Sequence, residues 1–125
     1  MELNTQTLVV VFQIIIALGI VNVWIVRFNK STDYRGGGAS SMKEEFEAYG
    51  LSETVMKLVG FLKLTLAALL VIGIWYPIVV IPAAAGMAGL MIGALLMHIK
   101  IGDPSIKSLP ALLMLVMSGF IVFMA

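Results

Sequence analysis

The sequence predicts an all-α integral membrane protein, an antiparallel bundle of four transmembrane helices with a short amphipathic helix in its first loop. Of the 125 residues, 61% are hydrophobic and only 12% are charged, whereas ordinary soluble domains contain roughly 25% charged residues. The apolar residues also occur in runs of about 20, the length that a helix needs to cross the hydrocarbon core of a bilayer. A soluble protein of this size could not bury so much apolar surface, because small domains leave a large fraction of their surface exposed.

Four apolar runs are expected to be the membrane spans, at about residues 8–26, 58–75, 78–97 and 109–124. Helices are expected in all four, because a helix satisfies its own backbone hydrogen bonds in lipid. The first run lacks the basic start and the cleavage site of a secretory signal, and is interpreted as a retained helix. The whole chain, residues 1–125, is interpreted as a single transmembrane domain.

The connection between the first two spans is about thirty residues long and is predicted to contain a helix of its own. Ser41 and Glu44 have the spacing of a capping box, which predicts a helix over about residues 42–49. On this helix Met42, Phe46 and Tyr49 fall at positions i, i+4 and i+7, so they share one face. That face is interpreted either as part of a lid over the bundle or as a surface for a partner protein.

The basic residues predict the orientation of the spans. Apart from Lys63, which falls inside a span, all lie on the side of the two polar loops, and none lies in the tight turn between the second and third spans. Because Lys and Arg are retained on the cytoplasmic side of membranes, the polar loops are expected to be cytoplasmic and both termini outside.

Lys63 is the sharpest candidate for a functional residue, since it is the only charged residue inside an apolar run. An ionisable side chain within a span is costly and usually faces a partner or a cavity. The alternative is that its ammonium group reaches the loop-side interface along its flexible stem. Gly60 lies on the same helical face, where a small residue favours close packing of another helix.

Four other polar residues are expected near the same depth as Lys63. With it they form a predicted shallow pocket at the loop side, made of Asn22, Arg27, Lys63, His98 and Asp103. Alternatives stay open for two of them, since Asn22 suits a helix–helix hydrogen bond and His98 suits the negative end of a helix dipole.

Two glycine-containing patterns complete the set of candidate sites. Arg35, followed by Gly36–Gly38, is interpreted either as part of an anion site or, more simply, as the start of a flexible linker. Ala85, Gly89 and Gly93 recur every four residues, which favours close helix packing inside the bundle or between the protomers of a homodimer.

The composition excludes several function classes. A net charge of +1 gives no indication of a nucleic-acid partner. The absence of cysteine excludes thiolate nucleophiles, disulfide relays and iron–sulfur clusters, and a single histidine excludes a bis-histidine haem. No residue is therefore assigned a catalytic role, no metal site is predicted, and whether the protein is an enzyme stays open.

Three passages resemble small bacterial membrane proteins of the DoxX-like family: residues 28–37, residues 42–51, and residues 97–111 with His98, Asp103 and Pro104. The resemblance implies a four-helix bundle in the bacterial cytoplasmic membrane. It also implies an accessory or quinone-interacting subunit of a membrane redox system, with quinone as the ligand and a redox protein as the partner. The alternatives are a small-solute transporter that uses Lys63, and an assembly factor or chaperone that docks its partner on Met42, Phe46 and Tyr49.

Overall fold

The computed structural model describes residues 4–125, so Glu2 and its two neighbours lie outside the described part of the chain. Within residues 4–125 the ordered elements are all helical. Four are long: α1 (Thr5–Val21), α3 (Glu53–Ile72), α4 (Val80–Lys100) and α5 (Leu109–Met124). All four are long and apolar enough to cross a membrane. The predicted all-α membrane bundle is confirmed, including a short helix in the first loop, α2 (Met42–Ala48).

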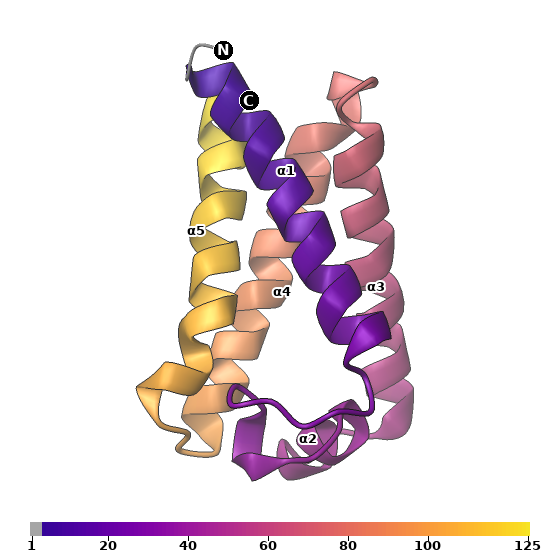
Figure 1. Ribbon diagram of the computed structural model, residues 1–125, viewed down its shortest axis with the longest axis vertical. Helices are drawn as coiled ribbons and strands as arrows, with labels where there is room; N and C mark the ends of the chain where they lie inside the picture. Colours follow the sequence, from indigo (N-terminus) through magenta and orange to yellow (C-terminus); the bar gives the residue numbers. More distant parts are fainter. Residues whose placement is uncertain (1–3) are drawn as a thin grey trace.

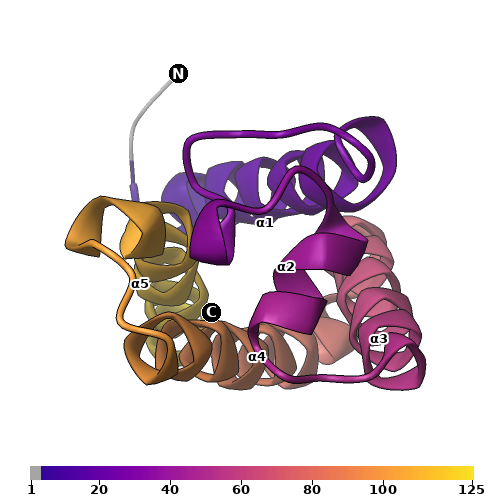
Figure 2. The ribbon, with the colours of Figure 1, turned by 90° about the horizontal axis from the view of Figure 1, so that it is seen from below.

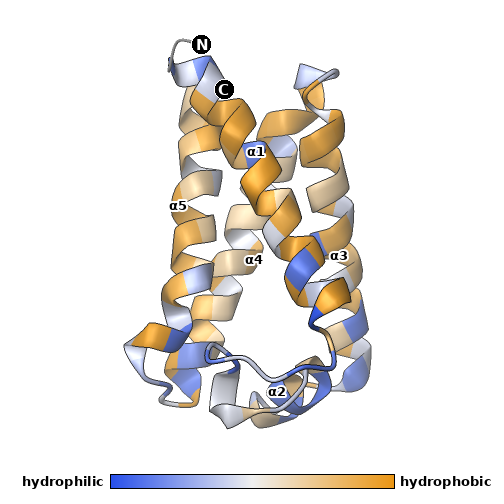
Figure 3. Ribbon diagram, viewed as in Figure 1, coloured by the Kyte–Doolittle hydropathy of each residue, from blue (hydrophilic) through white to orange (hydrophobic). Residues whose placement is uncertain are grey.

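The long helices form a four-sided bundle with α2 across one end. Helix α1 packs against α3 and α5, and α4 packs against the same two helices from the opposite side. The two termini and the α3–α4 turn lie at one end of the bundle, and α2 lies at the other with the two polar connections (Figures 1 and 2). Hydrophobic residues dominate the long helices, while hydrophilic ones gather at the α2 end (Figure 3).

Side chains cap the starts of three helices. Asn4 Oδ1 accepts a hydrogen bond from the Thr7 N–H at 2.9 Å, Ser41 Oγ from Glu44 at 3.2 Å, and Ser52 Oγ from Val55 at 3.2 Å. These bonds satisfy donors that a helix N-terminus leaves without an intrahelical partner. After α2 the chain turns at Gly50, whose φ of 78° is a conformation that glycine adopts without strain.

Three of the long helices extend beyond the apolar runs in the sequence. Helix α1 begins at Thr5, before the run that starts at Leu8. Helix α3 begins at Glu53, before the run that starts at Leu58, and α4 continues to Lys100, past the end of its run at Met97. An apolar run marks only the part of a helix that lipid covers, whereas backbone hydrogen bonding continues into the polar interface. Short 3₁₀ turns, η3 (Pro77–Val79) and η4 (Ser105–Ser108), lead into α4 and α5.

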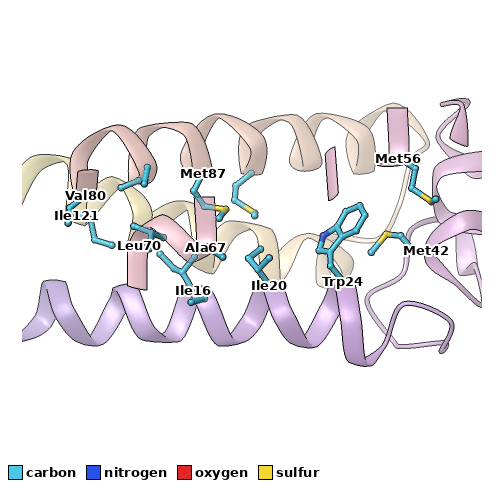
Figure 4. Close-up of a cluster of buried hydrophobic side chains, with 14 of the residues drawn as sticks. Ile16, Ile20, Trp24, Met42, Met56, Ala67, Leu70, Val80, Met87 and Ile121 are labelled. Carbon is cyan, nitrogen blue, oxygen red and sulfur yellow. The ribbon is translucent and has the colours of Figure 1, made fainter. Parts of the chain in front are cut away.

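The core is tightest in the half of the bundle away from α2. Ile16, Leu70, Met87 and Ile121 are fully buried there and meet between the helices (Figure 4). Gln13 is buried among them and donates a hydrogen bond from Nε2 to the carbonyl oxygen of Leu70 at 2.7 Å. The helix–helix bond satisfies a polar group that would otherwise be costly to bury.

Candidate ligand cavity

The half of the bundle nearest α2 contains a cavity of about 900 Å³. Side chains from all four long helices, from α2 and from the two polar connections line it. Its volume falls in the range of about 300–1,000 Å³ that is typical of sites for small molecules. The cavity lies where the tightly packed core ends, so the bundle is solid at one end and hollow at the other.

Gly89 and Gly93 of α4 line the cavity and do not lie at a contact with another helix. A Cβ atom added at either position would meet no atom within 4 Å, and Ala85, one turn earlier, is exposed. The expectation that this stripe packs closely inside the bundle was therefore wrong. Spacing identified a common face of α4, but it could not show that the face borders open space.

Trp24 forms part of the cavity wall because the end of α1 is a π-helical turn, η1 (Asn22–Val26). The wider turn places the indole against α3, where Gly60 leaves space for it. A Cβ at Gly60 would lie 2.6 Å from the Trp24 ring, too close for any side chain. Such π-turns are frequent at functional sites.

Lys63 lines the same cavity with its ammonium group over the Trp24 ring, 5.5 Å from the centroid. This is the geometry of a cation–π interaction, which partly compensates for removing the charge from water. The side chain is half-buried, and its Nζ makes no ion pair with a residue between 4 and 125. The ammonium group therefore keeps hydrogen-bond donors for a ligand.

His98 and Asp103 form a buried pair at the loop-side end of the cavity. His98 Nδ1 lies 2.7 Å from Asp103 Oδ2, and the Gly37 N–H donates to Asp103 Oδ1 at 3.0 Å. Burial acts to raise the pKa of Asp103. The hydrogen bonds from Gly37 and His98, with the charge of Lys107, outweigh it and lower the pKa overall. His98 itself lines the cavity.

The roof of the cavity is a row of ring contacts that begins at Trp24 and ends at His98. Phe46 and Tyr49 of the α2 segment lie between them, and the three successive distances between ring centroids are 5.8, 5.8 and 5.9 Å. All three contacts are close to edge-to-face, which is favourable for aromatic pairs.

The α2 face therefore forms a lid and does not offer a docking surface. Met42, Phe46 and Tyr49 are 3%, 7% and 5% exposed, so the alternative that they bind a partner protein was wrong. Two lysines from the other connection hold this lid: Lys100 Nζ donates to the Tyr49 carbonyl at 2.9 Å, and Lys107 Nζ to the Arg35 carbonyl at 2.7 Å.

Arg35 organises the first connection and has no donor left for an anion. Its five guanidinium N–H groups meet five acceptors: the carbonyl oxygens of Arg27, Phe28 and Lys30, the Glu45 carboxylate and the Met42 sulfur. The ion pair with Glu45 is 3.1 Å long, and Arg35 is buried. The interpretation of Arg35 as an anion site is therefore not supported, because a guanidinium group has only five donors.

The three glycines after Arg35 are part of a packed turn. A Cβ at Gly36 would lie 2.6 Å from the Tyr49 ring, and Gly37 and Gly38 have φ values of 65° and 68°. The alternative interpretation, a flexible linker, overlooked this packing, since glycine serves close approach and positive φ as well as flexibility.

Glu45 is a cavity residue that the sequence analysis missed. Its carboxylate binds Arg35 through one oxygen and accepts a hydrogen bond from the Tyr49 hydroxyl group through the other. Burial first, and then the negative charge of Glu45, raise the pKa of Tyr49 well above its ordinary value, so the phenol stays protonated. Glu45 lies four residues before Tyr49, a spacing that could have placed both on one face of α2.

The structure brings most of the predicted pocket residues to one place. Asn22, Arg27, Lys63 and His98 all line the cavity, as does Arg35, while Asp103 reaches it only through His98. No contact joins Asn22 to Lys63 among the hydrogen bonds of residues 4–125.

One comparison identifies the family of the chain. The model of the DoxX-like family matches residues 34–120. No curated protein and no solved structure matches the chain. The matched region contains α2, α3, α4 and most of α5, with Lys63, His98 and Asp103, while Trp24 and Asn22 precede it. Because the match covers well over half of the sequence and four apolar helices accompany it, the chain is a multi-pass membrane protein that belongs to the DoxX-like family.

Proposed function

We propose that this protein is an accessory subunit of a membrane redox system and that its cavity binds the ring of a quinone. The observation that carries the proposal is the cavity of about 900 Å³, which has apolar walls and polar groups at its loop-side end. Sites for small molecules typically combine such a wall with a few polar groups that fix the orientation of the ligand.

A quinone ring matches this chemistry on two counts. It is a flat apolar disc, and the indole of Trp24 and the open faces of Gly89 and Gly93 provide a surface and a space for one. It also bears two carbonyl oxygens, which would lose hydrogen bonds to water on burial. Lys63 and Asn22 carry N–H donors on the cavity wall that replace those bonds.

The shape of the bundle favours entry from the membrane. Gly19 of α1 touches Met114 of α5, and from the N-terminal end α1 leans away from α5 toward α3 (Figure 1). Beyond this contact both helices line the cavity, and Gly89 of α4 is exposed. We therefore expect a lipid-soluble ligand to enter between α1 and α5, with the α2 lid closed.

The role of an accessory subunit rests on the side chains available for electron transfer. No group of three or more His, Asp or Glu side chains within residues 4–125 is placed to hold a metal ion. Electrons for a bound quinone ring would therefore come from, or pass to, a partner protein that carries its own redox group.

Tryptophan fluorescence tests the proposal directly, because quinones quench indole emission at short range. The chain has two tryptophans: Trp24 on the cavity wall and Trp75, which is 71% exposed at the opposite end of the bundle. Titration of the detergent-solubilised protein with a short-chain ubiquinone should give saturable quenching. Trp75→Phe should keep this quenching, and Trp24→Phe should lose it. Unsaturable quenching of equal size in both variants would contradict the proposal.

A matched pair of glycine substitutions tests the location of the ligand. Leucine at Gly93 would fill cavity space, whereas leucine at Gly119 of α5 would also enter open space but does not border the cavity. We expect Gly93→Leu to weaken quinone binding at least about tenfold, a loss of about 1.4 kcal/mol. Gly119→Leu should bind like the wild type. Equal affinities in the two variants would place the quinone elsewhere.

A further inference from the structure

The hydrogen bonds of Asp103 determine which nitrogen of His98 faces the cavity as an acceptor. Gly37 donates to Asp103 Oδ1, so the other oxygen, Oδ2, faces His98 Nδ1 at 2.7 Å. A carboxylate can only accept hydrogen bonds, and the pKa of Asp103 is lowered, which favours its charged form. The proton of this pair therefore lies on Nδ1, and a neutral His98 has its lone pair on Nε2.

Nε2 of His98 is available to a ligand. No residue between 4 and 125 makes a hydrogen bond to it. The Tyr49 ring packs edge-on against the imidazole, but its hydroxyl donates to Glu45. In the described part of the chain, Ser118 Oγ is the only fully buried side-chain nitrogen or oxygen without a hydrogen-bond partner. Nε2 of His98 also has no partner, so it is not fully buried. Since His98 is 5% exposed and lines the cavity, its free nitrogen is reached through the cavity.

We infer that His98 makes the cavity prefer the reduced, hydroxyl-bearing quinol over the oxidised quinone. This inference rests on the proposed function and goes further, because it names the redox form that binds. A quinol O–H donates to the Nε2 lone pair, whereas a quinone carbonyl offers no proton and places a second lone pair against the first. Asp103 is a positioning residue, which sets the preference through the tautomer of His98.

The size of the preference follows from one hydrogen bond. A buried acceptor that is left without a donor loses about 1–3 kcal/mol. We therefore expect the wild-type protein to bind a quinol about tenfold more tightly than the matching quinone, because 1.4 kcal/mol, a value within this range, corresponds to a factor of ten.

The orientation of Asp103 makes a sharper test available. In Asp103→Asn we expect the amide oxygen to take the place of Oδ1, because an amide NH₂ group cannot accept the hydrogen bond from the Gly37 N–H. The NH₂ group then faces Nδ1 and donates to it, which moves the ring proton to Nε2. His98 becomes a donor toward the cavity, and because a quinone carbonyl and a quinol hydroxyl oxygen can both accept from it, the preference for the quinol should be lost.

The experiment measures the affinities of decylubiquinone and decylubiquinol under anaerobic conditions by thermal shift of the full chain in detergent. Wild type should prefer the quinol, whereas His98→Phe and Asp103→Asn should each bind the two forms alike. A merely structural role for Asp103 would weaken both ligands together and leave their ratio unchanged. That unchanged ratio would overturn the inference.

The remaining outcomes separate this inference from the proposed function. Equal binding of the two redox forms by the wild type would overturn the inference and leave the quinone site in place. Binding of neither form would overturn both. If Asp103→Asn does not fold, the comparison of wild type with His98→Phe tests the inference. An unchanged preference in His98→Phe would overturn it, because His98 would then not determine the preference.

Discussion

The position of the Trp24 indole depends on a neighbouring glycine, Gly60. The indole is buried between α1, α2 and α3, where it contacts Phe46 and lies under the ammonium group of Lys63. The place is open only because α3 carries Gly60 opposite the ring. Gly60 thus fixes one wall of the cavity without lining it, and the fit of Trp24 against it can be tested by adding a side chain.

Gly60→Val should destabilise the protein. Its Cβ would lie 2.6 Å from the Trp24 ring, and the buried indole cannot move aside as a flexible chain end would. Overpacking of this kind costs about 1–3 kcal/mol. The thermal unfolding midpoint in detergent measures the effect, with Gly119→Val as the control because its Cβ enters open space. Equal midpoints in the two variants would show that Trp24 does not pack there.

At the scale of elements, the two polar connections are joined by three hydrogen bonds. Gly37 donates to Asp103, Lys100 to the carbonyl of Tyr49, and Lys107 to the carbonyl of Arg35. They join the α4–α5 connection to the segment that carries α2. The lid over the cavity is therefore held from the far side of the bundle, and one of its bonds depends on the charge of Asp103.

That bond predicts a pH dependence of stability. Since the folded-state pKa of Asp103 lies below its ordinary value of 3.8, its stabilisation is fully present above about pH 3.8. It is lost as the pH falls from there through the lowered pKa. Asp103→Ala should therefore be less stable than wild type at neutral pH, by about 2 kcal/mol for charged hydrogen bonds.

Thermal midpoints measured across the acid range check this prediction. The gap between wild type and Asp103→Ala should be constant down to about pH 4 and close below it. Asp33→Asn, which changes an exposed acid in the same connection as Gly37, should match wild type throughout. A gap that stayed open at the lowest pH would show that the charge of Asp103 does not stabilise the lid.

The helices could be predicted from the sequence because their signals are local. Run length identified the four spans, and the spacing of Ser41 and Glu44 placed the start of α2. The face of α2 was also correct, but only the assembled bundle shows that this face is buried. Glycine was the weakest guide, since Gly60 meets an indole, Gly36 meets a phenol ring and Gly93 meets open space. A glycine in the sequence does not indicate whether another side chain or open space lies where its own side chain would be.

The same distinction applies to the polar residues. Sequence placed Lys63, His98 and Asp103 at a similar depth, because depth follows from position along a helix. The sequence could not predict that Arg35 would use all its hydrogen-bond donors inside the first connection, nor that Gly37 would orient Asp103. The Gly37–Asp103 bond joins segments 66 positions apart, so it exists only after the helices have packed. The partners of Arg35 lie within ten residues of it, but in a connection that has no regular repeat to reveal them.

At the scale of the whole molecule, charge is concentrated at one end. Seven of the eight Lys and Arg residues lie in the two polar connections or in the adjoining turns of α3 and α4, and the eighth, Lys63, lies halfway along α3, while the α3–α4 turn at the opposite end has none. Aromatic residues take their place in that turn, where Trp75 and Tyr76 are exposed as membrane-interface anchors usually are. The molecule therefore has a polar end with the lid and a nearly uncharged end with both termini.

This asymmetry predicts that the lid faces the cytoplasm and that both termini lie outside it, because Lys and Arg are retained on the cytoplasmic side. Alkaline phosphatase, which is active only outside the cytoplasm, should be active when fused after Ala125 and inactive when fused after Gly102, in the α4–α5 connection. A green fluorescent protein fused at the same two points should give the opposite pattern. Phosphatase activity at Gly102 alone would show the opposite orientation, with the lid facing the periplasm. Cytoplasmic redox partners could then not reach the His98–Asp103 end of the cavity. The two reporters together thus decide which compartment can supply the partner that the proposed function requires.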